Sequence, residues 1–201
     1  MAKQPTRIIP GSAKEHRVIF FAIITMTLLL VIDQITKAVV VQRIAIGEKI
    51  TIIPDFFYLT HVTNRGAAWG ILQGHGWLLL IIATVASCLI IIKLRWLTEG
   101  LIERYFIIFI IFSGIVGNSI DRIWRREVID FLDFIIWPAY RNATWQLTSW
   151  PSFNVADSAI CIGVCAYFIS LIMRPELKKS PILGNKNDNQ SKKAENKINH
   201  A

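Results

Sequence analysis

Residues 18–41 read VIFFAIITMTLLLVIDQITKAVVV, and this stretch sets the class of fold. It is apolar for long enough to cross a bilayer, which takes about 20 residues of helix. A basic segment precedes it, as in a signal peptide, but the run exceeds an ordinary h-region and lacks a small-residue cleavage pattern. The stretch therefore predicts a retained transmembrane helix that carries two charged side chains, Asp33 and Lys37, toward one end.

Three further apolar runs follow, at residues 77–92, 105–117 and 153–173. With 53% hydrophobic residues and a mean hydropathy of +0.46, the 201-residue chain is unlike an ordinary soluble domain. Residues 44–53 and 56–62 mix β-branched, aromatic and polar side chains, as strands do. We predict an all-α membrane protein: a four-transmembrane-helix bundle over residues 18–173, with a small extracytoplasmic β-rich segment at 42–76 and a short outer loop or helix at 119–152.

The basic excess is unevenly distributed. The chain has 22 Lys and Arg against 14 Asp and Glu, and both tails plus the 93–104 loop hold 14 basic and six acidic residues. The remaining residues hold eight of each, so the excess lies on one side of a four-span protein. The positive-inside rule then places the basic tail at 1–17 and the tail at 174–201, which we expect to be disordered, in the cytoplasm. The excess is a topology signal, and no nucleic-acid partner is expected.

Polar residues gather where the apolar runs end on the opposite, outer side. They are Asp33, Asn118, Asp121, Asn154 and Asp157 at helix ends, and Asp130 in the loop after the third run. Carboxylates at membrane depth are costly and are rarely present without a function. Several of them at one depth predict an active site at the extracytoplasmic membrane surface.

Asp130 and Asp157 form the main hypothesis for that site. Two adjacent carboxyls cannot both ionise cheaply, so one stays protonated and the pair can act as acid and base on one water molecule. Such a pair suits peptide hydrolysis with no metal, no cofactor and no covalent intermediate. The alternative is that Asp157 is only a helix N-cap and Asp130 is a solvated loop acid.

Spacing alone leaves the partner of Asp157 open, because Asp121 and Asp133 compete with Asp130 for that role. Arg122 follows Asp121 directly and offers it an ion-pair partner. The same arginine could instead neutralise a catalytic carboxylate or bind a substrate carbonyl.

Two shorter motifs add to this set. Asp33 and Lys37 are spaced i,i+4, so they share a helix face and can pair, either as a structural anchor or with a direct role. The stretch NRGAAWG at 64–70 joins small residues to an asparagine that can both donate and accept hydrogen bonds. It predicts a tight turn that packs against the site or enters the outer leaflet.

Other chemistries lack their motifs. The four His residues are scattered without an HExxH pair, so no metal site is expected, and no GxSxG elbow or glycine-rich phosphate loop is present. The three Cys residues lie in apolar runs and are expected to act as small apolar side chains. An ion-coupled transporter would place its acids near mid-membrane, whereas these gather at one end. A non-catalytic scaffold would tolerate Asn at both Asp130 and Asp157.

Five ordered motifs connect the chain to a known family. They are DQITK at 33–37, NRGAAWG at 64–70, GNSIDR at 117–122, VIDF at 128–131 and FNVADS at 153–158. In this order they resemble the signature blocks of bacterial lipoprotein signal peptidase, also called signal peptidase II. The resemblance covers residues 18–173, and Trp69 stands where many members have Phe.

The resemblance implies an inner-membrane aspartyl endopeptidase that removes signal peptides from diacylglyceryl-modified prolipoproteins. It would cut on the N-terminal side of the lipidated cysteine at the outer face. Its expected partners are these substrates, membrane lipids and globomycin-type inhibitors, with the protein a monomer. The family's catalytic pair maps onto Asp130 and Asp157. Its supporting polar residues map onto Asp33, Lys37, Asn64, Asn118, Arg122 and Asn154. Gly66 and Asp121 lie in the same motifs, and we expect them to be further supporting or substrate-binding residues.

Overall fold

Four helices form the membrane part of the protein. In the computed structural model, which describes residues 7–66, 71–141 and 144–173, they are α1 (Ala13–Arg43), α2 (Gly76–Thr98), α3 (Ile102–Trp124) and α4 (Val155–Met173). Each is long and apolar enough to cross a membrane, so the predicted four-helix membrane fold is confirmed.

The described residues up to Phe168 form one compact unit, which holds the whole of the candidate site. The second unit, 169–201, is described only as far as Met173, the end of α4. The expectation for the tail at 174–201 therefore lies outside the described residues, as do the side chains of 137–149.

α1 begins within the segment expected to be a tail, because its N-terminus is capped. Ser12 Oγ accepts a hydrogen bond from the Glu15 backbone N–H at 3.2 Å, and Glu15 Oε2 accepts one from the Gly11 N–H at 2.5 Å. This Ser-x-x-Glu pattern resembles a capping box, which satisfies N–H groups that the first helical turn leaves free. Residues 13–17 are therefore helical.

The outer segments form an antiparallel sheet in the order β1-β2-β3-β4. Its strands are β1 (Lys49–Ile53), β2 (Phe57–Asn64), β3 (Val128–Arg141) and β4 (Thr144–Ser149). The first two occupy the predicted β-rich segment. In place of the expected short outer loop or helix, α3 runs to Trp124 and two strands follow. β-branched and aromatic residues are frequent from 128 to 136, and β2 offers this run an edge to pair with.

The pairing of β3 determines where Asp130 lies. In the register with β2, Asp130 stands opposite Val62. Two residues farther along β3, Leu132 forms a bridge with Phe153, just before α4. The start of β3 therefore lies beside both the end of β2 and the segment that leads into α4.

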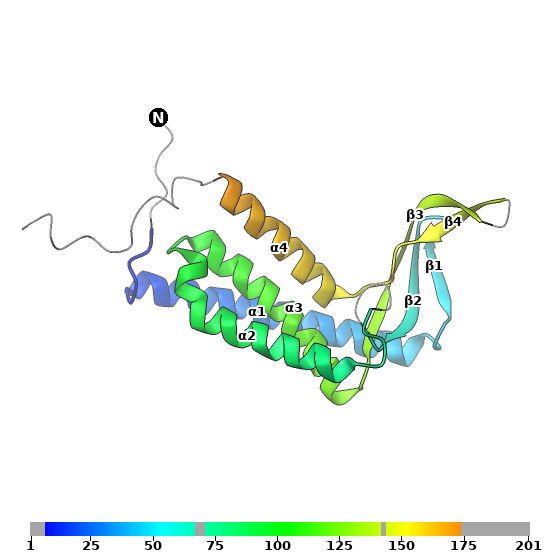
Figure 1. Ribbon diagram of the computed structural model, residues 1–201, viewed down its shortest axis with the longest axis horizontal. Coiled ribbons are helices and arrows are strands. Elements are labelled where there is room, and N and C mark those ends of the chain that lie inside the picture. Colours follow the sequence, from blue (N-terminus) through cyan, green and yellow to red (C-terminus); the bar gives the residue numbers. More distant parts are fainter. Residues whose placement is uncertain (1–6, 67–70, 142–143, 174–201) are drawn as a thin grey trace, which may run out of the picture. The chain divides into compact units, whose positions relative to one another are not determined.

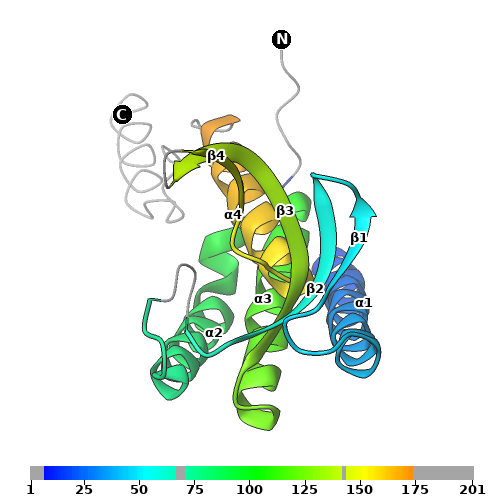
Figure 2. The ribbon, with the colours of Figure 1, turned by 90° about the vertical axis from the view of Figure 1, so that its right-hand side faces the viewer.

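The sheet lies against one end of the helices. Figures 1 and 2 show it beside the C-terminal ends of α1 and α3 and the N-terminal ends of α2 and α4. Val40 and Ile44, at the end of α1, pack in a buried cluster with Ile129 and Phe131 of β3. This apolar contact holds β3 across the helix ends, so polar side chains from strands and helices can meet there.

Small residues let α3 and α4 approach closely. A Cβ added to Gly114 would collide with the Ala156 carbonyl oxygen, and one added to Gly117 would come within 2.8 Å of Asp33 Oδ2. Close approach at small residues is common between membrane helices. Here it brings the N-terminus of α4 to α1, where the Ala156 N–H donates to Asp33 Oδ1 at 2.9 Å.

We predict that Gly114→Ala destabilises the protein, because the added methyl group must push two backbones apart. Overpacking of this kind costs about 1–3 kcal/mol. Thermal unfolding in detergent, followed by tryptophan fluorescence, should show a lower midpoint than for the wild type. The matched control is Gly76→Ala at the start of α2, where a Cβ would have its nearest neighbour 4.0 Å away. That control should unfold like the wild type, and an unchanged midpoint for Gly114→Ala would contradict the close packing.

Candidate active site

The N-terminus of α4 places Asp157. Asn154 Oδ1 accepts the Asp157 backbone N–H at 2.9 Å, and Asp157 Oδ2 accepts the Asn154 N–H at 3.2 Å. In this reciprocal cap Asn154 is the N-cap residue and Asp157 stands three residues later, so Asp157 is not the N-cap that the alternative supposed. The other oxygen of Asp157 accepts from Asn118 Nδ2 at 2.7 Å.

Asp130 reaches the same place from β3. It is only 3% exposed, and its two oxygens accept hydrogen bonds from Asn154 Nδ2 at 2.8 Å and Asn64 Nδ2 at 3.0 Å. Asn154 therefore contacts both acids, and both line one cavity. Among the described residues, neither Asp130 nor Asp157 forms a salt bridge. The two acids are held by amides rather than by cations.

The surroundings of Asp130 make it hold a proton more tightly than an exposed aspartate does. Burial, and after it the charge of Asp157, raise the pKa of Asp130 from the usual 3.8 to about 7. Hydrogen bonds from Asn64 and Asn154 and the charge of Lys37 act in the opposite direction. A carboxyl that titrates near neutral pH can serve as a general acid or a general base.

The other two candidate partners of Asp157 are engaged with cations. Asp121 forms ion pairs with Lys37, at 2.7 Å, and with Arg125. Asp133 forms one with Lys49 at 2.5 Å. Each of these two carboxylates is therefore engaged in an ion pair, whereas Asp130 and Asp157 take part in none of the salt bridges of the described residues.

None of the salt bridges of the described residues joins Arg122 to Asp121, although their adjacency in the sequence had suggested such a pair. The Arg122 guanidinium donates to two backbone carbonyls, Asn118 O at 3.3 Å and Gly66 O at 3.2 Å. Neighbouring residues on a helix point in different directions, so an i,i+1 pair does not meet. The side chain instead lines the cavity, where its positive charge acts on the two acids.

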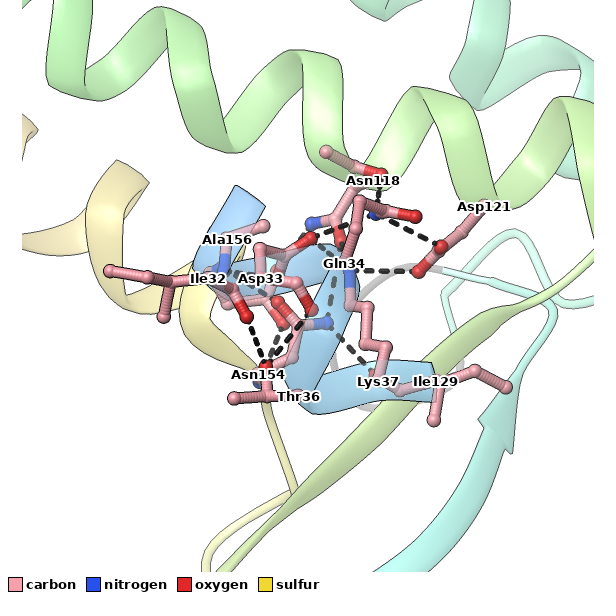
Figure 3. A network of polar contacts seen from close by, with 12 residues as sticks. Ile32, Asp33, Gln34, Thr36, Lys37, Asn118, Asp121, Ile129, Asn154 and Ala156 are labelled. Carbon is pink, nitrogen blue, oxygen red and sulfur yellow. Dashed lines mark hydrogen bonds and ion pairs between the residues drawn. The ribbon is translucent and has the colours of Figure 1, made fainter. Parts of the chain in front are cut away.

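Lys37 lies behind the cavity wall and is fully buried. Its ammonium group contacts Asp33 Oδ2 at 2.9 Å, Asp121 Oδ2 at 2.7 Å and Asn118 Oδ1 at 3.1 Å (Figure 3). The predicted pair of Asp33 and Lys37 is therefore confirmed. Because Asn118 also donates to Asp157, it connects this charged cluster to the cavity.

Gln34 and Arg125 complete the cluster, although no motif argument singled them out. Gln34 Nε2 donates to Asp33 Oδ2 at 3.0 Å and Asp121 Oδ1 at 3.3 Å, and Gln34 Oε1 accepts from Arg125 Nη1 at 3.1 Å. Arg125 stands i,i+4 from Asp121, a spacing that could have identified it. Gln34 directly follows Asp33 in the first motif, so its position there was the available signal.

A cavity of about 550 Å³ opens beside the two acids. Of the predicted site residues, those that line it are Asn64, Gly66, Asn118, Arg122, Asp130 and Asp157. Those buried outside the lining are Asp33, Lys37, Asp121 and Asn154. Sequence reasoning missed other lining residues, among them Val62, Val128, Phe153, Ser158 and Cys161. Within the described ranges, no group of three or more His, Cys, Asp or Glu side chains is placed to hold a metal ion.

The turn after β2 requires glycine at position 66. The Gly66 N–H donates to Asn64 Oδ1 at 2.9 Å, which turns the amide nitrogen of Asn64 toward Asp130. A Cβ at position 66 would come within 2.7 Å of the Ile71 carbonyl oxygen. The expected tight turn is thus seen packed against the site as far as Gly66, and residues 67–70, including Trp69, lie outside the described ranges.

Sequence comparison relates most of the chain to a known family. A family model described as signal peptidase (SPase) II matches residues 25–173. The lipoprotein signal peptidase of Listeria monocytogenes serotype 4a (strain HCC23) is 39% identical over 147 residues, which make up 72% of this chain and 88% of the relative. The lipoprotein signal peptidase of Bacillus subtilis (strain 168) is 36% identical over 152 residues, or 76% and 93% of the two chains.

Two solved structures share the fold. A bacterial membrane enzyme structure obtained by the in meso method at 2.3 Å resolution matches with a TM-score of 0.68 and 27% identity, over 90% of this chain and 99% of that chain. Another, at 1.9 Å resolution, matches with a TM-score of 0.62 and 28% identity, over 84% and 97% of the two chains. The likeness therefore extends over helices and sheet together.

We predict that Asp130 makes the fold less stable as the pH rises. Its pKa is about 7 in the folded protein against an ordinary value of 3.8, so the folded state binds the extra proton between these values. Its stabilising contribution is fully present below about pH 4 and is lost as the pH rises through about 7. The loss is on the order of 1 kcal/mol per pH unit.

Thermal unfolding midpoints between about pH 4 and about pH 8 check this expectation. Asp130→Asn lacks the titrating group, so its thermal unfolding midpoint should rise relative to that of the wild type as the pH increases. Asp55→Asn changes an exposed acid in the turn before β2 and should follow the wild type at every pH. A constant difference between Asp130→Asn and the wild type would contradict the raised pKa.

Proposed function

The chain belongs to the signal peptidase II family, which removes signal peptides from prolipoproteins, and we propose that it works as an aspartyl endopeptidase with Asp130 and Asp157 as its catalytic pair. Its described residues include four helices long and apolar enough to span a membrane, and it is a multi-pass protein of the bacterial inner membrane. One observation carries the proposal. Both carboxyls line the same cavity, Asn154 bonds to both, and neither has a salt bridge among the described residues.

A pair of carboxyls in this setting supports hydrolysis by an activated water molecule. One carboxyl, ionised, takes a proton from the water, while the other, protonated, gives a proton to the scissile carbonyl oxygen. The pKa of about 7 for Asp130 supports a state in which one of the two acids is protonated near neutral pH. Acid–base help of this kind contributes typically about 10²–10⁴ in rate.

The surroundings of the cavity support a lipid-modified peptide as substrate. We infer that the bond cut lies on the N-terminal side of a diacylglyceryl-modified cysteine. Val62, Val128 and Phe153 give the cavity an apolar wall, and Arg122, which also lines it, is the residue that we expect to bind a substrate carbonyl. Exposed apolar side chains on α2 and α4 suit contact with acyl chains and with a signal helix.

The distribution of charge supports a site at the outer face of the membrane. The positive-inside rule puts both termini in the cytoplasm. Four crossings then put the ends of α1 and α3 and the start of α4, and with them both acids, at the outer face. The expected partners are lipidated prolipoproteins, membrane lipids and globomycin-type inhibitors, and we expect the protein to act as a monomer.

We predict that Asp130→Asn and Asp157→Asn each abolish cleavage, because neither variant can share a proton between two carboxyls. Each purified variant is mixed in detergent with a diacylglyceryl-modified precursor, and cleavage is read as a gel shift. The rate should fall by at least about 10²-fold, the lower end of acid–base contributions. Asp55→Asn changes an exposed acid outside the cavity and should cleave at the wild-type rate.

A globomycin-type inhibitor should block the shift that the wild type produces. Size-exclusion chromatography and thermal unfolding show whether each variant is folded. Cleavage by a folded variant would remove its residue from the catalytic pair. If the wild-type protein produces no gel shift of the precursor, the result would count against the peptidase function itself.

A further inference from the structure

The amide of Asn118 can take only one orientation. Lys37 donates to Asn118 Oδ1 at 3.1 Å, and an ammonium group has donors only. The amide oxygen must therefore face Lys37, and the NH₂ group must face Asp157, whose Oδ1 accepts it at 2.7 Å. Because Lys37 is fully buried, its charge polarises this amide more strongly than it would in water.

The position of Asp157 in α4 also stabilises a negative charge on its carboxylate. Its other oxygen accepts the Asn154 backbone N–H at 3.2 Å, and it stands in the first turn of the helix. The N-terminal end of a helix carries a partial positive charge that favours an anion. An oriented amide, a backbone N–H and the helix end therefore all stabilise the ionised form of Asp157.

The groups around Asp130 stabilise a negative charge less strongly than those around Asp157. Asp130 lies on β3, outside any helix, and its two hydrogen bonds come from the side-chain amides of Asn64 and Asn154. The oxygens of these amides accept from neutral backbone groups, the N–H of Gly66 and of Asp157, each at 2.9 Å. Of the two acids, Asp130 is the one whose surroundings favour the protonated form.

Resting on the peptidase function proposed above, we propose that Asp157 stays ionised, that Asp130 holds the shared proton, and that Lys37 imposes this order through Asn118.

Asp157 takes a proton from the water as the water oxygen bonds to the scissile carbonyl carbon, and Asp130 protonates the carbonyl oxygen. Asp157 then gives its proton to the amide nitrogen as the C–N bond breaks. Asp130 recovers a proton from one of the two hydroxyls as the new carboxyl group forms. Both acids return to their starting states, and Lys37, which touches no reacting atom, is a positioning residue.

Among the described residues, no charged side chain near the acids donates a hydrogen bond directly to either of them, and the negative charge of Asp33 opposes the ionised form of Asp157. These charged side chains are Asp33 and Lys37 on α1, Asp121 and Arg122 on α3, and Arg65 at the cavity, which pairs with Glu127. Asp33 and Asp121 are both paired with Lys37, and Arg122 acts on both acids. The hydrogen bond through Asn118 is directed at Asp157 alone.

The pH profile of kcat/KM for a diacylglyceryl-modified precursor tests the order of the acids. The rate should rise as Asp157 ionises and fall as Asp130 loses its proton. Asn118→Ala removes a donor to Asp157 and should move the acid limb up by about one pH unit, with little change in the alkaline limb. Asn64→Ala removes a donor to Asp130 and should move the alkaline limb up by about the same amount. Each variant is the control for the other, because each removes one amide donor from one of the two acids. The pH at which a limb falls does not depend on how much of the enzyme is folded.

A double-variant cycle tests the role of Lys37. Lys37→Met should move the acid limb in the same direction as Asn118→Ala, and both changes together should move it no farther than either alone. If Lys37→Met does not fold, Asp33→Asn/Lys37→Met removes one charge of each sign and takes its place. Additive shifts would overturn the action of Lys37 through Asn118.

If Asn118→Ala moves the alkaline limb and Asn64→Ala moves the acid limb, the proposal is overturned, because Asp130 would then be the ionised acid and Asp157 the protonated one. Limbs that stay in place in both variants would also overturn it. Asp130→Asn and Asp157→Asn, assayed in parallel, separate the two proposals. If either still cleaves, the catalytic pair itself is wrong; if both are inactive, only the order of the acids is in question.

Discussion

The ammonium group of Lys37, buried among two carboxylates and an amide oxygen, is the interaction around which the rest of the structure is arranged. Buried charges are tolerated when they are paired and hydrogen-bonded. Losing one partner of a buried pair typically costs about 3–5 kcal/mol, because the other charge is left uncompensated. Asp33 comes from α1 and Asp121 from α3, so this cluster ties two helices together at one level. Asp33 also accepts the Ala156 N–H, which brings in the start of α4.

Asparagine side chains carry this constraint from the cluster to the cavity. An amide has a donor and an acceptor at a fixed spacing, so a group that can only donate decides where its nitrogen points. Lys37 orients Asn118 in this way, and backbone N–H groups orient Asn64 and Asn154. All three amide nitrogens consequently face Asp130 or Asp157. The carboxyl pair is thus held by donors whose directions are set by the other hydrogen bonds of the same three amides.

The acids at this end of the protein differ in their partners. Asp121 forms an ion pair with Lys37, and Asp133 forms one with Lys49. Asp130 and Asp157 have amide and backbone donors instead. Burial and the charge of Asp157, with no salt bridge to Asp130 among the described residues, leave Asp130 with a pKa of about 7, where a proton can be exchanged. The contrast explains how neighbouring aspartates can serve as scaffold in one case and suit proton transfer in another.

Hydropathy, spacing and motif order were enough to predict the four helices, the Asp33–Lys37 pair and the family. These features depend on residues within a few positions of one another or on blocks that can be recognised singly. The strand that carries Asp130, the contacts of Asp130 with Asn64 and Asn154, and the ion pair of Asp133 with Lys49 were decided only by the tertiary structure. Each depends on how β3 pairs with β2 and on how the sheet meets the ends of the helices. Such contacts join residues far apart in the chain, and local sequence patterns carry no signal for them.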